Sequence, residues 1–207
     1  MSELEVQTAE ASDAGPRQPG LRERGKARRR SAIIRAAFEL FAERGYHATT
    51  VADIAERAEV APRTVAMYFP TKQDIALSRF SSGIASLHEA LSGRERGESI
   101  TAVLGRWLLT SQPGLEDAEL TRLARRMFAA NPDLAALRQA QLAAAIREGA
   151  VMIAAEAGRD PDAIGPRLAS AAAAAVVMEV ADTEPGPGRE EAVGAAMRFI
   201  SAGLAAL

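Results

Sequence analysis

Hydrophobic positions recur at helical spacing along almost the whole chain. The clearest stripe lies between Lys26 and Arg44, and Gly45 follows it as a helix C-terminal stop. The apolar positions of this stripe are Ile33, Ile34, Ala37, Phe38, Leu40 and Phe41. The pattern predicts an all-α fold that begins, after a polar N-terminal segment, with an amphipathic helix over 26–44.

Three more helices are predicted by the capping and proline signals that follow. The pairs Thr50 and Asp53, and Thr71 and Asp74, have the Thr-x-x-Asp spacing of a capping box. The first pair predicts a short helix from residue 51 and the second a longer helix from residue 72. Pro62 favours a first helical turn and Pro70 disfavours continuation, which together predict a short helix over 62–69.

The rest of the chain divides at Gly and Pro breakers into five further helices, for about nine in all. Their expected ranges are 100–110, 116–130, 132–157, 161–182 and 189–206, with the sequence TEPGPG separating the last two. The predicted organisation is a disordered arm over 1–23, a domain over 24–72 with a helix-turn-helix at 50–69, and a larger helical domain over 73–207.

Charge is distributed unevenly along the 207 residues. The chain has a net charge of −2, but residues 24–80 hold eleven Lys and Arg against six Asp and Glu. This local excess of +5 is typical of a module that binds a polyanion, and a solvated charged face is the alternative. The chain has no cysteine, which excludes disulfides and thiolate metal sites; we expect no metal. No run approaches the roughly 18 to 20 apolar residues of a membrane span and no secretory signal is present, so we expect a cytoplasmic location and no membrane partner.

Three helices of this size fit a helix-turn-helix unit, in which the second short helix enters the major groove of DNA. Hydroxyl, guanidinium, phenol and ammonium groups at its exposed positions suit contacts with phosphates and base edges. The candidate DNA-binding residues are Thr50, Pro62, Arg63, Thr64, Met67, Tyr68 and Lys72.

Residues 24–80 resemble the N-terminal domain of the TetR family of transcriptional regulators. The resemblance rests on AAFELFAERGYHATTVADIAERAEVAPRTVAMYFPTKQDI. It implies a homodimer that binds a palindromic DNA operator, represses transcription and leaves the DNA when a small molecule enters the C-terminal domain. The large side chains of that domain favour a mostly apolar effector. Two departures stand out: Glu59 replaces a common Gly, and Ala66 and Met67 replace common aromatic residues, which points to an unusual operator.

The C-terminal helices supply candidate residues for dimerisation and effector binding. Two stripes with spacing near 3.5 suit a four-helix dimer interface, although a monomer could bury them in its own core. These stripes are Ile164, Leu168, Ala171 and Ala175, then Val193, Met197, Ile200 and Leu204. The large side chains expected to line a ligand pocket, or else simply to fill the core, are His88, Trp107, Met127, Phe128, Met152 and Met178. Arg125 and Arg126 could pair with an anionic ligand group or remain solvated.

An enzyme is not expected. The two histidines, His47 and His88, do not stand with carboxylates at metal or triad spacing, and no Gly-rich phosphate loop is present, so we expect no cofactor. The alternative function is a helical protein-interaction adaptor, or a small-ligand binding protein without DNA activity. That alternative would explain the C-terminal stripes but not the +5 segment.

Overall fold

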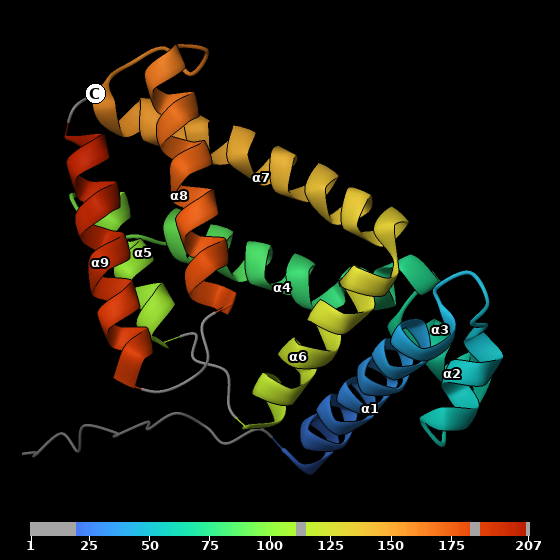
Figure 1. Ribbon diagram of the computed structural model, residues 1–207. Helices are drawn as coiled ribbons and strands as arrows, with labels where there is room; N and C mark the ends of the chain where they lie inside the picture. Colours follow the sequence, from blue (N-terminus) through green and yellow to red (C-terminus); the bar gives the residue numbers. More distant parts are fainter. Residues whose placement is uncertain (1–19, 111–114, 183–186, 206–207) are drawn as a thin grey trace, which may run out of the picture.

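The computed structural model describes residues 20–110, 115–182 and 187–205, and in these ranges it contains nine helices and no strand (Figure 1). Their bounds are α1 Leu21–Arg44, α2 Val51–Arg57, α3 Pro62–Tyr68, α4 Lys72–Ser92, α5 Ile100–Thr110, α6 Leu115–Ala130, α7 Pro132–Ala157, α8 Ile164–Asp182 and α9 Pro187–Leu204. The predicted all-α architecture is confirmed.

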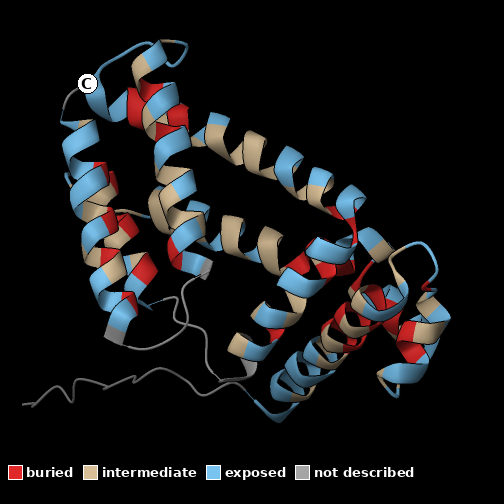
Figure 2. Cartoon of the chain, in the orientation of Figure 1, coloured by how far each residue is buried: buried red, intermediate tan, exposed pale blue. Residues whose placement is uncertain are grey.

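The N-terminal helices pack around the apolar stripe of α1. Phe38 and Phe41 of α1 are fully buried, and Ile54 of α2 and Val65 of α3 close over them. In Figure 2 the buried residues of this region concentrate along α1 and the adjoining face of α2. α2 and α3 have seven residues each and would not be stable as isolated helices. Burial of these apolar side chains against α1 is the main interaction that stabilises them.

The predicted helix caps are confirmed. Thr50 and Asp53 form a reciprocal capping box at the start of α2, and Thr71 and Asp74 form the same arrangement at the start of α4. Pro62 occupies the first turn of α3. The capping boxes satisfy free N–H groups at the starts of α2 and α4, and Pro62 has no N–H that needs a partner at the start of α3. These signals are local, so the sequence alone placed these boundaries correctly.

Three helix starts differ from the predicted ones by two residues or more. α1 begins at Leu21 rather than Lys26, since Arg, Lys and Glu propagate a helix well even when fully exposed. α8 begins at Ile164, three residues later than expected. α9 begins at Pro187, inside the predicted breaker, because a proline is tolerated in a first helical turn. The predicted arm lies outside the described residues except for its last few positions, which include the first turn of α1.

The core does not divide at the predicted domain boundary. Leu120 and Met127 of α6 and Leu134 of α7 belong to the same buried cluster as α1, and so do Ile75 and Ala76 of α4. The N-terminal unit is therefore built on α6 and the start of α7, and α4 runs from it into the C-terminal helices (Figure 1).

The C-terminal helices form a second core from α5, α8 and α9. Its buried side chains are Leu104, Leu108, Val180, Val193, Ala196 and Ile200. α7 and α8 approach closely where Ser170 Oγ donates to the carbonyl oxygen of Ile146 at 2.7 Å. A β-carbon at Gly149 would lie 2.6 Å from that hydroxyl oxygen, so any other residue there would displace the Ser170 hydroxyl.

α8 corrects one expectation about membrane-length segments. Its window Ile164–Ala181 has a mean hydropathy of 1.4 and is long and apolar enough to cross a membrane by length and composition, although the sequence pattern had suggested that no segment is. Only 17% of this window is buried within the chain. A helix this apolar and this exposed indicates a surface that something else covers.

Candidate DNA-binding surface and ligand cavity

The orientation of α3 is fixed by two buried side chains. Val65 is completely buried and Phe69, just past the helix end, is 6% exposed. The opposite face therefore points to solvent, with Pro62, Arg63 and Met67 exposed. Met67 is 75% exposed, which is unusual for a large apolar side chain and is explained if this face contacts another molecule.

The polar candidates around α3 are partly engaged within the chain. The Thr50 hydroxyl accepts from the Asp53 N–H at 3.1 Å and donates to the Asp53 carboxylate at 2.7 Å. The Thr50 backbone N–H, which donates to the Asp53 carboxylate at 2.7 Å, and then the Thr50 hydroxyl hold the pKa of the Asp53 carboxyl below its usual range. The half-buried Tyr68 accepts a 3.5 Å hydrogen bond from Arg29 Nε of α1, and Thr64 is half-buried. The capping box thus fixes the first turn of α2, and the phenol links the end of α3 to α1.

Lys72 has a structural contact that sequence reasoning missed. Its ammonium donates to the carbonyl oxygens of Tyr46 and Thr49 at 2.6 and 2.7 Å, so it pins the loop between α1 and α2. Burial lowers the pKa of Lys72. The partners are 26 and 23 residues away, and no local motif indicates them. The phosphate contact of Lys72 remains a prediction, in addition to this structural role in holding the loop.

A basic surface extends from α3 along the start of α1. Exposed cations occupy the first turns of α1, at Arg22, Arg24, Lys26, Arg28 and Arg29. Arg30 lies with its guanidinium 5.2 Å from the ring centre of Phe69 and so joins this surface to the end of α3. Cations clustered in this way favour a polyanion such as the phosphate backbone of DNA.

Asn131, between α6 and α7, ties the helix-turn-helix unit to the C-terminal helices. Its buried amide nitrogen donates to the carbonyl oxygens of Phe41 and Met127 at 2.9 and 2.7 Å, and its oxygen accepts from the Tyr46 N–H at 2.6 Å. The sequence indicated Asn131 only as a helix breaker.

A cavity of about 310 Å³ lies among α4, α7 and α8, with side chains of α1, α5 and α6 completing its wall. Five of the six predicted ligand residues line it, namely His88, Trp107, Phe128, Met152 and Met178. The prediction for the sixth residue, Met127, was wrong. Met127 is fully buried in the cluster around α1, whereas its neighbour Phe128 lines the cavity. The volume is at the lower end of the range of about 300 to 1,000 Å³ for ligand pockets.

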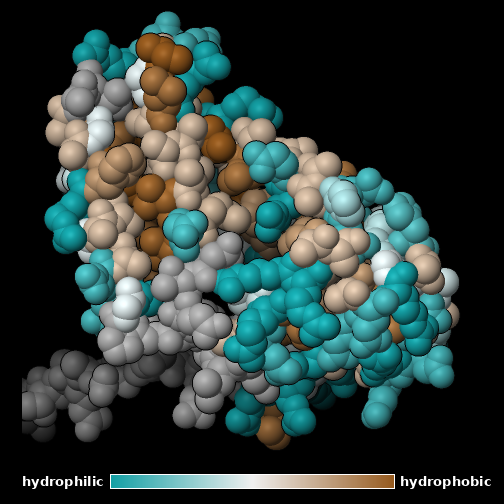
Figure 3. Space-filling view, in the orientation of Figure 1, coloured by the Kyte–Doolittle hydropathy of each residue, from teal (hydrophilic) through white to brown (hydrophobic). Residues whose placement is uncertain are grey.

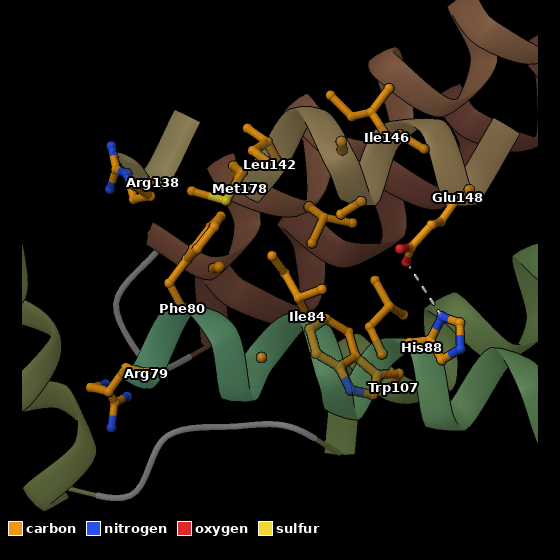
Figure 4. Close-up of a pocket in the computed structure, with 18 of the residues that line it drawn as sticks. Arg79, Phe80, Ile84, His88, Trp107, Arg138, Leu142, Ile146, Glu148 and Met178 are labelled. Atoms are coloured by element: carbon orange, nitrogen blue, oxygen red, sulfur yellow. Dashed lines mark ion pairs between the residues drawn. The ribbon is translucent and has the colours of Figure 1, made fainter. Parts of the chain in front are cut away.

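The two ends of the cavity differ in charge (Figure 4). At one end Arg79 and Arg138 lie near α6, where Arg79 donates to the Thr121 hydroxyl at 3.4 Å. At the other end His88 Nδ1 lies 3.8 Å from a Glu148 carboxylate oxygen. Of the two arginines expected to meet an anionic group, Arg125 lines the cavity and Arg126 is exposed outside its wall. The sequence did not indicate Arg79, Arg138 or Glu148, because their convergence depends on tertiary packing.

The two predicted dimer stripes have different outcomes. The α8 residues point to solvent, with Ile164 65% and Leu168 61% exposed and Ala171 and Ala175 also exposed. The α9 stripe instead faces the chain's own core: Val193 and Ile200 are buried, and Met197 and Leu204 pack against the same cluster. That part of the prediction was wrong, since helical spacing marks an apolar face without saying what covers it. Apolar side chains gather over the region of α8 and α9 in Figure 3. Phe199 of α9 is 60% exposed.

Comparison with known proteins supports the regulator resemblance. The family model described as "Bacterial regulatory proteins, tetR family" matches residues 33–78. The HTH-type transcriptional regulator TcmR of Streptomyces glaucescens is 42% identical over 99 residues, which cover 44% of each chain. The fatty acid metabolism regulator protein of Bacillus subtilis is 42% identical over 59 residues, or 28% of this chain and 30% of that one. The matches thus span less than half the length of these curated relatives.

Solved structures share the fold over a longer range. Salmonella enterica GusR is 17% identical with a TM-score of 0.60, covering 86% of this chain and 95% of that one. A TetR-family regulator from Rhodococcus sp. is 24% identical with a TM-score of 0.55, covering 86% and 99%. The relatives are transcriptional regulators, in agreement with the expectation that the chain is not an enzyme. The family model over the helix-turn-helix region, the curated relatives and the shared helical architecture together support a TetR family transcriptional regulator.

Proposed function

We propose that the protein is a sequence-specific DNA-binding regulator, a repressor that leaves a palindromic operator when a small, mostly apolar ligand occupies the cavity. The observation that carries this proposal is α3: a short helix held by Val65 and Phe69 that presents Arg63 and Met67 outward beside a basic surface. A helix presented in this way suits insertion into the major groove.

Two copies of the chain would read the two halves of the operator. The exposed α8 stripe, centred on Ile164 and Leu168, together with Phe199 of α9, supplies an apolar surface suited to a symmetric pairing. Such a pairing would bury the exposed apolar residues of α8 in an interface between two protein chains. Their exposure in one chain then does not require a membrane.

α6 gives the ligand cavity a direct route to the DNA-binding unit. One side of this helix carries Leu120 and Met127 into the core around α1, and the other carries Thr121 and Phe128 to the cavity wall. Phe38 of α1 also lines the cavity. A ligand that moves α6 would therefore act on α1 and the helices packed on it without an intermediate element.

The test is selection of bound sequences from a random duplex DNA library, followed by gel shifts with the selected duplex. We expect enrichment of a palindromic sequence and a shift that Arg63→Ala weakens, whereas Arg96→Ala, an exposed arginine in the loop before α5, leaves it unchanged. No enrichment with well-folded protein would contradict the proposal and favour the alternative of an adaptor or ligand-binding protein without DNA activity.

A further inference from the structure

The cavity is chemically asymmetric along its length. Its middle is apolar and is lined by Phe80, Ile84, Leu142, Ile146 and Met178 (Figure 4). Three arginines line it, at Arg79, Arg125 and Arg138, whereas the single carboxylate among the described lining residues is Glu148. Glu148 pairs with His88 at the end of the cavity away from Arg79 and Arg138.

The arginine end is built for a fixed geometry. Arg138 lies over the ring of Phe128, with its guanidinium carbon 4.5 Å from the ring centre. Stacking of this kind orients a guanidinium through its face and leaves its edge to donate hydrogen bonds. Arg79 reaches from α4 to Thr121 of α6. A guanidinium carries five N–H donors and bridges several acceptors at once, so this contact is compatible with an added anion.

The opposite end carries a natural reporter. Trp107 is the single tryptophan of the chain and lines the cavity near His88. Its indole N–H donates to the Ser86 hydroxyl at 3.1 Å, which fixes the ring. A molecule that spans the cavity would contact the arginines with one end and approach this ring with the other.

We propose that the cavity binds an elongated apolar molecule with one anionic group, a carboxylate, sulfate or phosphate, held at the arginine end while its apolar end lies toward Trp107. This deepens the proposed function by naming the chemical class of its ligand. The carboxylate of such a ligand would gain charge-assisted, bidentate hydrogen bonds that an uncharged analogue cannot form.

The first experiment compares dodecanoate with dodecan-1-ol, both below their aggregation concentrations, by titrating the Trp107 fluorescence of the full chain without DNA. We expect dodecanoate to bind roughly 10- to 100-fold more tightly, the range expected for a hydrogen bond to a charged group. Arg138→Gln should reduce this preference at least several-fold. Arg147→Gln, the same change at an exposed position of α7 outside the cavity wall, should leave it unchanged.

The second experiment tests orientation with two isomeric quenchers. The bromine of 12-bromododecanoate should lie near Trp107 and quench it more strongly at saturation than that of 2-bromododecanoate, which the arginines would hold at the far end. Equal or reversed quenching, equal binding of acid and alcohol, equal effects of the two arginine variants, or no saturable binding of dodecanoate would each overturn the proposal. Because these measurements use no DNA, their outcome is separate from that of the gel shifts.

Discussion

The Lys72 ammonium lies 4.4 Å from the ring centre of Tyr46 and donates a 2.6 Å hydrogen bond to the carbonyl oxygen of the same residue. A second hydrogen bond reaches the carbonyl of Thr49, one residue before the N-cap of α2. The first residue of α4 therefore sets the position of the loop that leads into the helix-turn-helix. Loss of these contacts should affect both folding and DNA binding.

We expect Lys72→Met to lower the free energy of unfolding by about 1 to 3 kcal/mol. The change keeps the apolar stem of the side chain but removes the ammonium, which leaves the partly buried carbonyl groups of Tyr46 and Thr49 without this donor. Urea unfolding measures this, and Lys26→Met at an exposed position of α1 should change it little.

If Lys72 also contacts a phosphate, its loss should weaken binding to all DNA sequences about equally and make the salt dependence of binding shallower by about one unit of slope. An unchanged slope would restrict Lys72 to its structural task.

Arg63→Ala should cost about 1 to 3 kcal/mol of binding free energy and relax base preference at one position per half-site, since a bidentate contact with a guanine edge is lost. Arg63 is exposed on α3. We therefore expect an unchanged melting temperature. Sequence-preference profiles of the variant and parent that coincide would show that Arg63 does not read a base.

Asn131→Ala should be among the most destabilising single changes outside the apolar core. It removes the partners of one N–H and two carbonyl groups, those of Tyr46, Phe41 and Met127, in a site where the asparagine is 7% exposed. We expect a loss of about 2 to 4 kcal/mol in urea unfolding, given about 1 to 3 kcal/mol for each unsatisfied buried group and partial rescue by water. A loss below about 0.5 kcal/mol, as for an ordinary surface change, would contradict this role.

Leu168→Glu should convert a dimer into a monomer, because it places a charge in the middle of the exposed α8 stripe. Sedimentation velocity measures the change, and circular dichroism checks that the helices remain. Leu21→Glu is the matched control, since Leu21 is 81% exposed at the start of α1, far along the chain from α8. A parent protein that sediments as a monomer would rule out the α8 pairing at the concentration used.

What the sequence could predict depended on the range of the interactions. Capping boxes and proline positions are local, so the starts of α2, α3 and α4 were correct. The face of α8 and that of α9 have the same apolar spacing, yet Leu168 is exposed and Val193 is buried. Spacing identifies an apolar face, whereas only tertiary packing decides whether the chain itself covers it. The same reason explains why the cavity's basic end, which joins α4, α6 and α7, was only partly anticipated.

Glu59 adopts φ of 54° in the turn between α2 and α3, the one described non-glycine residue with a positive φ. This left-handed conformation costs an L-amino acid roughly 1 to 2 kcal/mol, and glycine avoids that cost while losing more chain entropy on folding. We expect Glu59→Gly to raise the free energy of unfolding by up to about 1 kcal/mol. Glu56→Gly, the same change at a helical position of α2 in the preceding turn, should lower it by about 1 kcal/mol because glycine is a poor helix former. The same Glu→Gly change is thus expected to raise the free energy of unfolding at position 59 and to lower it at position 56, and urea unfolding measures both. A lower free energy of unfolding for both variants would show that the side chain of Glu59 stabilises the fold by more than its backbone conformation costs.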